Sequence, residues 1–438
     1  MPNRYPFYFS LSRRRFLSLL PGGFAGAALA AVEDAPRLAV QRREIEVLGR
    51  PAEASRLALQ NGQEGLHLEP GERLRFLFHN ELGMTLRAHL HGQTPPAGMA
   101  AAVEGDGYLG FDLEPRPGSH WIHSTGDLTR QRLLAAPLIV HGPRPPWPEL
   151  TVLLQDFCFR PAEEILANWQ DPAWRRSFQP DTCLANGYGL DAPDPVRVAP
   201  GQRLLLRLIN AAATSDFILD AGPLRAQLVA VDGNPVRPLP VRKLPLLLGQ
   251  RADLLLDMPP EHGAWGLLAR RAGSRLRTGI IFGTRRGYVR RLPPLAESKA
   301  DEVDPAFDVR LAPPQPESPM RQERRLALRL AEGASGAPWR LISEDGQPLA
   351  MRLGEKVELT VRNETATAHV LHLHGHHVRM AGLNGQALPG ILRDTFAVPA
   401  RGSATIVFRA DRAGDWPIAG QNLYDGLSGL SATLSCRE

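Results

Sequence analysis

One pattern occurs twice in this chain and limits the folds that it can adopt. The turn Pro70-Gly71-Glu72 precedes an apolar stretch at residues 74–78, and the similar turn Leu353-Gly354-Glu355 precedes another at residues 357–361. A His-x-His element follows each stretch. Short strand-like stretches bounded by glycine- and proline-containing turns are typical of β-sandwiches. The repeat therefore indicates that one sandwich unit occurs at least twice.

The length and composition agree with several such units. A chain of 438 residues is too long for one ordinary domain. Its 41 glycines and 40 prolines favour many short strands and turns over long helices. We therefore expect an all-β protein with domains over residues 37–145, 146–288 and 323–438 and a proline-rich linker over residues 289–322.

Histidines are concentrated near the C-terminus. Five of the 13 lie within residues 369–377, namely His369, His372, His374, His376 and His377. Side chains two positions apart share a face of a strand, so His372, His374 and His376 are expected to point the same way. Neutral imidazole is the commonest metal ligand and suits copper, zinc, iron and nickel. The alternative is a polar strand edge or an adventitious metal patch.

Residues 1–31 have the pattern of an export signal. Ser12-Arg13-Arg14-Arg15-Phe16-Leu17 is a twin-arginine pattern, and the apolar stretch at 17–31 is too short and too glycine-rich to span a membrane. Small residues at Ala28-Leu29-Ala30 offer a cleavage site. A chance arginine cluster before another type of signal or anchor is the alternative. We expect twin-arginine export to a bacterial periplasm, a mature chain that starts near Ala31, and no membrane span.

The charge distribution argues against a nucleic-acid-binding site, and the positions of the cysteines argue against a Cys-His metal site. The net charge is +5, but basic and acidic residues are mixed and no basic patch alternates with aromatic residues, so nucleic-acid binding is not expected. The three cysteines, Cys158, Cys183 and Cys436, leave at least one thiol without an intramolecular partner. Whether Cys158 and Cys183 form a disulfide is not decided by the sequence. None of the three lies beside a histidine, so the chain has no Cys-His metal spacing.

Three motifs resemble the copper-binding motifs of three-domain multicopper oxidases, particularly those of the copper-resistance branch. His89-Leu90-His91-Gly92 matches the first motif, the stretch at 118–125 around His123 resembles the second, and residues 369–374 match every histidine of the third. The stretches at 231–236, 249–253 and 393–399 also agree. The resemblance covers nearly the whole mature chain. It implies three cupredoxin-like Greek-key β-sandwich domains.

The chain departs from the family at the fourth motif. The family has His-Cys-His followed by a further histidine, and the corresponding residues here are Ala419, Gly420, Gln421 and Asp425. In the second motif, Thr125 replaces the second histidine. A blue copper site needs a cysteine thiolate and two imidazoles. The resemblance therefore implies that this electron-entry site is lost.

The resemblance assigns the remaining motif histidines to copper. Five ligands of the family's trinuclear cluster are retained, namely His89, His91, His123, His372 and His374, and His369 remains from the blue site. These imidazoles are expected to hold one or two copper ions between the first and third domains. An empty site is the alternative, because a fold does not imply a function. His376 is not expected to be a ligand, and His377 is expected at the surface.

Three functions stay open at this point. The first is a periplasmic protein that binds copper and stores, delivers or senses it, which the retained pair His89 and His372 favours. The second is an oxidoreductase, a copper-dependent oxidase that uses the remnant cluster without a blue site. The third is a copper-free structural or interaction protein with a periplasmic protein partner.

Overall fold

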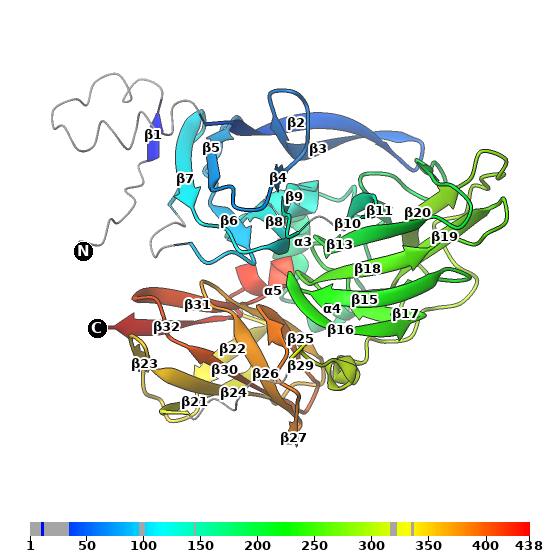
Figure 1. Ribbon diagram of the computed structural model, residues 1–438. Coiled ribbons are helices and arrows are strands. Elements are labelled where there is room, and N and C mark those ends of the chain that lie inside the picture. The colour runs from blue at the N-terminus through cyan, green and yellow to red at the C-terminus, as the bar shows by residue number, and fades with distance from the viewer. Residues whose placement is uncertain (1–9, 13–34, 96–100, 144–145, 316–321, 334–336) are drawn as a thin grey trace.

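The structure, a computed structural model, describes residues 10–12, 35–95, 101–143, 146–315, 322–333 and 337–438 (Figure 1). The export signal expected over residues 1–31 lies outside this part of the chain, apart from residues 10–12. Within the described residues, six sheets form three pairs that follow one another along the chain, and the helices are short. No helix among the described residues is long and apolar enough to cross a bilayer. The expected all-β fold is confirmed.

The first sheet pair has its own core. Its five-stranded sheet has the order β1-β7-β5-β2-β3, and its four-stranded sheet has the order β4-β9-β8-β6. Every second residue of β7 is buried, as in a strand with one face on a core, and the rings of Phe76 and Phe111 stack there 4.6 Å apart. The elements are β1 (Ser10–Ser12), β2 (Arg37–Val47), β3 (Arg50–Leu59), β4 (Leu66–Leu68), β5 (Leu74–Asn80), β6 (Ala88–His91), β7 (Gly107–Leu113), β8 (Gly118–Ser124), the 3-10 helix η1 (Thr129–Arg132) and β9 (Ala135–Val140).

The second sheet pair carries two short helices beside its strands. Its sheets have the orders β11-β10-β13-β18-β15-β16 and β12-β20-β19-β14-β17. Parallel pairing of β10 with β13 and antiparallel pairing of β13 with β18 make this a mixed sheet. The elements are β10 (Glu149–Phe157), α3 (Ala162–Asn168), α4 (Pro172–Ser177), β11 (Thr182–Ala185), β12 (Val196–Arg197), β13 (Arg203–Asn210), β14 (Phe217–Asp220), β15 (Arg225–Val231), β16 (Asn234–Val241), β17 (Lys243–Leu246), β18 (Arg251–Asp257), β19 (Ala264–Arg271) and β20 (Arg277–Gly283).

The third sheet pair contains the histidine-rich segment. One sheet has the order β22-β21-β24-β30-β26-β27, with β28 paired to β26, and the other has the order β23-β32-β31-β25-β29. The elements are β21 (Arg324–Glu332), β22 (Trp339–Ser343), β23 (Leu349–Arg352), β24 (Lys356–Asn363), β25 (His369–Leu373), β26 (Val378–Leu383), β27 (Gln386–Ala387), β28 (Leu392–Arg393), β29 (Thr395–Val398), β30 (Ser403–Arg409), β31 (Gly414–Gly420), α5 (Leu423–Leu427) and β32 (Ser431–Arg437). Figure 1 shows α5 near the centre of the molecule, between the three sheet pairs.

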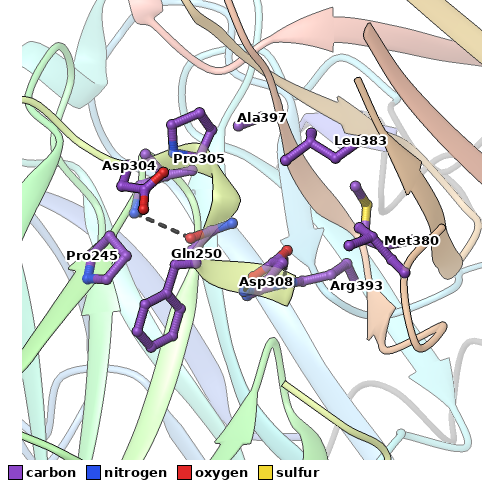
Figure 2. Close-up of a pocket in the computed structure, with 12 residues that line it drawn as sticks. Pro245, Gln250, Asp304, Pro305, Asp308, Met380, Leu383, Arg393 and Ala397 are labelled. Atoms are coloured by element: carbon purple, nitrogen blue, oxygen red, sulfur yellow. Dashed lines mark hydrogen bonds and ion pairs between the residues drawn. The ribbon is translucent and has the colours of Figure 1, made fainter. Parts of the chain in front are cut away.

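The segment between the second and third pairs is packed against both. It contains the 3-10 helix η2 (Pro305–Arg310), whose Phe307 is buried in a core that the two pairs share. Asp308 of η2 accepts a 2.6 Å hydrogen bond from Arg393 of β28. A small cavity of about 20 Å³ lies at this junction, lined by η2, β17, β26 and β29 (Figure 2). The segment thus fixes how the third pair sits on the second.

A buried arginine joins all three sheet pairs. Arg251, at the start of β18, is fully buried, and its Nε donates to the Ser119 carbonyl of β8. Its two terminal nitrogens donate to the two carboxylate oxygens of Asp394, at 2.7 and 2.5 Å. Asp232 lies 3.4 Å from the same guanidinium. A buried charge needs partners of this kind, so the position of β6 and β8 relative to β25 is fixed by paired groups.

Candidate metal centre

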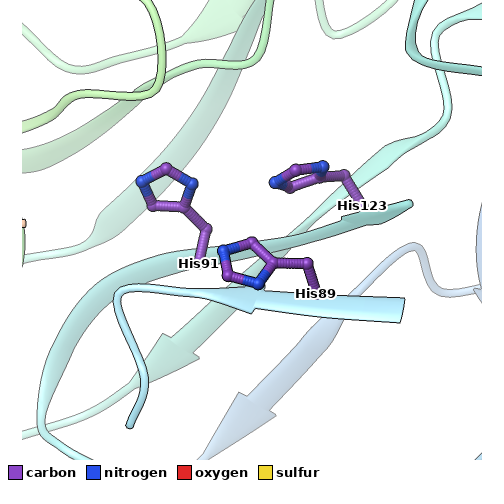
Figure 3. Close-up of side chains that lie close together, drawn as sticks. All are labelled: His89, His91 and His123. Atoms are coloured by element: carbon purple, nitrogen blue, oxygen red, sulfur yellow. The ribbon is translucent and has the colours of Figure 1, made fainter. Parts of the chain in front are cut away.

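Three histidines of the first sheet pair lie on one face of two neighbouring strands. His89 and His91 are two positions apart on β6, and His123 of β8 pairs directly with His89. Positions two apart and directly cross-strand share a face of a sheet. The ring centroids of His89 lie 5.5 Å from those of His91 and 5.0 Å from those of His123 (Figure 3).

Two histidines of the third sheet pair meet this face. His372 lies on β25, and His374 follows the end of that strand. The ring centroid of His89 lies 5.3 Å from that of His372 and 4.4 Å from that of His374, and the rings of His91 and His372 stack at 4.0 Å. Five imidazoles from sequence positions far apart therefore converge between the first and third pairs.

Hydrogen bonds leave one nitrogen of several rings free to bind a cation. His372 Nδ1 lies 2.8 Å from the Asp394 carbonyl, and His123 Nδ1 lies 2.8 Å from the Ser124 carbonyl, so each Nδ1 carries the proton that it donates. His91 uses Nε2 instead, 2.9 Å from Thr395 Oγ1. Within the described part of the chain, His91 Nδ1 and His123 Nε2 are buried and have no hydrogen-bond partner.

The spacing of the free nitrogens suits a metal ion. His89 Nε2 and His372 Nε2 lie 3.2 Å apart. Two imidazole nitrogens bound at about 2.0 Å to one tetrahedral metal would lie about 3.3 Å apart. The potential ligand atoms of His89, His372 and His374 lie within 4.8 Å of one another, and so do those of His89, His91 and His123.

The environment keeps these rings neutral, which is the form that binds metals. Burial lowers the pKa of His89, His91, His123 and His374 well below the ordinary value for histidine, and the neighbouring histidines and arginines lower it further. Burial also lowers the pKa of His372, although Asp394 opposes the effect. At neutral pH the five imidazoles therefore present lone pairs.

Asp394 orients two of the rings. It lies with His91 and His372 in a third group of possible ligands, but Arg251 already occupies both of its oxygens. Burial by itself would raise the pKa of Asp394, but the Arg251 guanidinium holds that pKa well below its ordinary value. Its carboxylate, fixed in this way, contacts His91 Nε2, and its backbone carbonyl accepts a hydrogen bond from His372 Nδ1, so Asp394 fixes the orientation of both rings.

No role in the site is expected from the sequence alone for the orienting residues. Asp394, Thr395 and Arg251 lie in stretches that resemble the multicopper oxidases, and that similarity was the available signal. Asp394 contacts His91, 303 positions away, and Arg251, 143 positions away, as well as the nearer His372. One sequence gives no indication of such pairs.

His369 lies in a different environment from the five clustered histidines. It belongs to none of the three groups of possible ligands within the described residues. Its Nε2 is 3.2 Å from Thr365 Oγ1, and its Nδ1 is 3.7 Å from Asp425 Oδ2. Asp425 Oδ1 accepts hydrogen bonds from the indoles of Trp169 at 2.8 Å and Trp339 at 3.1 Å. A carboxylate committed to two indoles beside one imidazole does not fit a blue copper ion, which needs a thiolate.

The space of a potential thiolate is also filled. Gly420 ends β31 and has no side chain, and a Cβ atom added there would lie 2.8 Å from Leu430 Cδ2. All three cysteines lie in the described part of the chain as free thiols, so Cys158 and Cys183 form no disulfide here. Burial raises the pKa of each thiol, to about 11 for Cys158. No cysteine belongs to the groups of possible metal ligands among the described residues.

Two expectations for the histidine-rich segment are wrong. His376 does not share the face of His372 and His374, because β25 ends at Leu373 and Gly375 then adopts a φ of +72°. The ring of His376 instead packs edge-on against other aromatic rings. His377 is not an open surface residue but is partly buried, and its Nε2 donates to the Gly92 carbonyl at 3.0 Å.

Comparison with known proteins identifies two regions of one family. Residues 149–285 and residues 314–430 each match a family model described as multicopper oxidase, and together they cover more than half of the chain. Multicopper oxidase MmcO of Mycobacterium tuberculosis is 25% identical in an alignment of 415 residues that covers 83% of this chain and 79% of that protein. Copper resistance protein A of Pseudomonas syringae pv. tomato is 24% identical in an alignment of 317 residues that covers 59% of this chain and 51% of that protein.

Solved structures share the fold at low identity. Fet3p, a multicopper oxidase that functions in iron import, aligns with a TM-score of 0.78 and 15% identity over 91% of this chain and 90% of its own. The multi-copper oxidase from Pseudomonas thermotolerans gives a TM-score of 0.70 and 20% identity over 91% of this chain and 98% of its own. These likenesses show the cupredoxin-like β-sandwich fold. With the two family-model matches, they show that this chain belongs to the multicopper oxidase family.

Proposed function

We propose that this chain is an exported protein that binds copper at its five clustered histidines and has no blue copper site for electron entry. Membership of the family implies copper as the cofactor. The single observation that carries the proposal is the set of buried imidazole nitrogens left without hydrogen-bond partners within the described residues, His91 Nδ1 and His123 Nε2, beside the facing Nε2 atoms of His89 and His372. Buried polar atoms normally have partners, so this arrangement favours a bound cation.

The residues would divide the work in a simple way. His89, His372 and His374 would hold a copper ion, and Asp394 with Thr395 would fix the orientation of rings in the cluster. Copper in such a site would either carry out one-electron redox chemistry or simply be stored there. The chain lacks a cysteine between the two sites, so the covalent route by which the family passes electrons to its cluster is not available.

Partial exposure of the cluster favours a second function, a copper-dependent oxidoreductase. His89 and His374 are partly exposed, whereas His91, His123 and His372 are buried. A small reductant could therefore approach the His89 side of the cluster directly. A copper-free structural role has no such observation in its favour, because a purely structural seam does not need unpaired buried imidazoles.

The export proposal rests on the twin-arginine pattern at residues 12–17. A fusion of residues 1–36 to a reporter that is active only after folded export tests it. Export that stops when Arg13 and Arg14 are both changed to lysine supports the twin-arginine route. Unchanged export of the lysine variant contradicts it.

The metal proposal is tested by metal content. The protein is matured in copper-supplied cells, and its metals are measured by mass spectrometry together with an electron paramagnetic resonance spectrum. We expect at least one copper per chain, with a spectrum typical of nitrogen ligation and no intense blue absorption. The double variant His89→Ala/His372→Ala should lose the copper, and the control His262→Ala, which removes an exposed histidine, should keep it.

Turnover then separates the two functions. Oxidation of a phenol or a cuprous ion that depends on His89 and His372 would support the oxidoreductase. Bound copper without turnover would support a binding protein. A protein that takes up no copper in cells or on reconstitution would contradict both.

A further inference from the structure

One stretch of the chain, far from the histidine cluster in sequence, carries a large excess of positive charge. Residues 264–302 contain nine basic and three acidic residues, a net charge of +6 in a chain whose total is +5. The rest of the chain is therefore close to neutral, and the mixture of basic and acidic residues expected from the sequence does not extend to this stretch. Eight of its basic residues are arginines, namely Arg270, Arg271, Arg275, Arg277, Arg285, Arg286, Arg290 and Arg291.

The fold brings the later arginines back to the earlier ones. Figure 1 shows β19 and β20 at the outer side of the second sheet pair, away from α5. After β20 the chain turns and runs back along that strand. Val289 packs on Gly283, where an added Cβ atom would lie 3.2 Å from Val289 Cγ2, and the Arg277 N–H donates to the Pro294 carbonyl at 2.9 Å. Residues 290–291 lie between these two contacts and are therefore placed beside β20.

The arginines at the other end of β20 crowd one another. Arg270 of β19 lies directly opposite Arg277 of β20, and like charges at such cross-strand positions are destabilising. Burial lowers the pKa of Arg277, and Arg270 lowers it further, although Glu297 opposes the effect. Arg271 points away, since its Nε donates to Ser215 Oγ at 3.1 Å. The other seven arginines form what we call the arginine surface.

The charge of the arginine surface is not neutralised within the described part of the chain, where none of the seven residues forms an ion pair. Three of them donate to backbone carbonyls instead, Arg270 to Ser298, Arg275 to Ala296 and Arg277 to Pro293, at 2.6, 2.7 and 3.0 Å. These acceptors fix the side chains but are uncharged. Residues 285–286 and 290–291 are exposed. An external anionic group would relieve this repulsion.

Exposed apolar side chains lie in the same segment. Tyr288 is 86% exposed and Leu295 is 48% exposed. Aromatic side chains beside basic ones are typical of protein surfaces that contact lipid headgroups. A leucine has no ring to stack on a nucleic-acid base, whereas the headgroup region of a bilayer accepts both side chains. The combination favours a lipid surface over a nucleic acid.

We propose that the arginine surface, with Tyr288, docks this protein on a bilayer that contains anionic phospholipids. The inference goes beyond copper binding and does not depend on it. Each arginine held near an anionic bilayer strengthens binding by about fivefold. The surface lies on the second sheet pair, so docking leaves the histidine cluster between the first and third pairs uncovered.

The test is cosedimentation of the full-length protein with two kinds of vesicle. One contains equal parts of phosphatidylglycerol and phosphatidylcholine, and the other contains phosphatidylcholine alone. We expect binding to the anionic vesicles and at least about tenfold weaker binding to the neutral ones. Binding should weaken as salt is added, because the range of charge attraction falls from about 10 Å at 0.1 M to about 3 Å at 1 M ionic strength.

A fourfold variant removes the most exposed charges, Arg285→Gln/Arg286→Gln/Arg290→Gln/Arg291→Gln. It should bind anionic vesicles at least about 100-fold more weakly than the parent. A matched control removes the same charge at exposed arginines elsewhere, Arg176→Gln/Arg324→Gln/Arg340→Gln/Arg352→Gln, and should stay within about threefold of the parent. If the fourfold variant does not fold, Arg285→Gln/Arg286→Gln alone should weaken binding by about 25-fold.

Tyr288→Ser separates a lipid surface from a soluble polyanion. It should weaken binding to anionic vesicles several-fold and leave retention on immobilised heparin unchanged. Equal binding to both kinds of vesicle, binding to neither, or equal losses in the fourfold variant and its control would each overturn the proposal. Binding to a duplex DNA fragment without binding to vesicles would also overturn it and would make the partner a nucleic acid.

Discussion

The carboxylate of Asp425 offers the sharpest test of how the region around His369 is built. Asp425 belongs to the third sheet pair, and its Oδ1 accepts from Trp169 of the second pair and from Trp339 of the third. The two indoles are 4% and 7% exposed. Replacement by leucine, Asp425→Leu, leaves both indole N–H groups buried without an acceptor.

The expected loss follows from the number of unpaired donors. A buried donor that loses its acceptor destabilises a protein by about 1 to 3 kcal/mol, so two donors predict about 2 to 6 kcal/mol, centred near 4 kcal/mol. Asp425→Asn keeps a carbonyl oxygen and loses only the charge. Since hydrogen bonds to charged groups exceed neutral ones by roughly 1 kcal/mol each, the asparagine variant should lose about 2 kcal/mol.

The assay is thermal and urea unfolding of metal-free protein, followed by near-ultraviolet circular dichroism, which reports on the tryptophans. A loss near 4 kcal/mol lowers the Tm by about 8 °C or more for a unit of this size. Adding Trp169→Phe, which removes one donor, should make Asp425→Leu less harmful by about 1 to 3 kcal/mol. Asp301→Asn, at an exposed carboxylate, is the control.

The reasoning fails if the leucine variant is as stable as the parent. It also fails if the effects of Trp169→Phe and Asp425→Leu simply add, because the hydrogen bond would then contribute nothing. Either result would mean that the indoles find other acceptors.

Three further predictions concern the buried charges and the metal. Burial lowers the pKa of His120 to about 3, so this imidazole stays neutral in the folded state, whereas in the unfolded state it takes up a proton below about pH 6.5. The free energy of unfolding is therefore unaffected by this group above about pH 6.5. It falls by about 1.4 kcal/mol per pH unit as the pH drops below that value. In the variant His120→Gln, the free energy of unfolding in urea should fall less steeply between pH 6.5 and 5 than in the parent. An equal slope in both proteins would refute the buried, neutral state of His120. Arg251→Leu leaves the Asp394 carboxylate buried without its cation and should destabilise the protein by about 3 to 5 kcal/mol. It should also weaken copper binding by about 10- to 100-fold. Unchanged stability in the same unfolding assay would contradict a stabilising role for the ion pair. Copper at about 1,000 times its Kd should stabilise the parent protein by about 4 kcal/mol relative to protein kept metal-free with a chelator, as measured by differential scanning calorimetry. It should not stabilise the variant His89→Ala/His372→Ala. An equal shift in both proteins would mean that the copper binds elsewhere.

Local patterns in the sequence predicted the fold well. Alternating apolar residues between glycine- and proline-containing turns define strands, and the structure has an all-β fold with six sheets among its described residues. The period-two rule holds for His89 and His91, which are two positions apart on β6 and share a face. The same rule failed for His376, because the strand ends before it and Gly375 turns the chain. Periodicity holds only while the backbone stays extended.

The rest of the site depends on contacts that sequence order hides. Trp169 and Asp425 are 256 positions apart, and Arg251 and Asp394 are 143 apart. The resemblance implies that Gln421 stands at a histidine position of the family, but the unpaired state of its oxygen depends on packing against the Gly249 turn. Which atoms are buried and which lack a hydrogen-bond partner depends on the three-dimensional arrangement of the chain, and a single sequence does not give that arrangement.

The 283 positions between His89 and His372 have a consequence for affinity. Neither sheet pair alone presents both of these nitrogens, so an ion held by His89 and His372 binds tightly only to molecules in which the first and last sheet pairs are docked. The apparent Kd then equals the intrinsic Kd divided by the docked fraction. Any change that loosens docking, such as a substitution in η2 far from every histidine, weakens copper binding by the same factor, and bound copper in turn holds the two ends of the chain together.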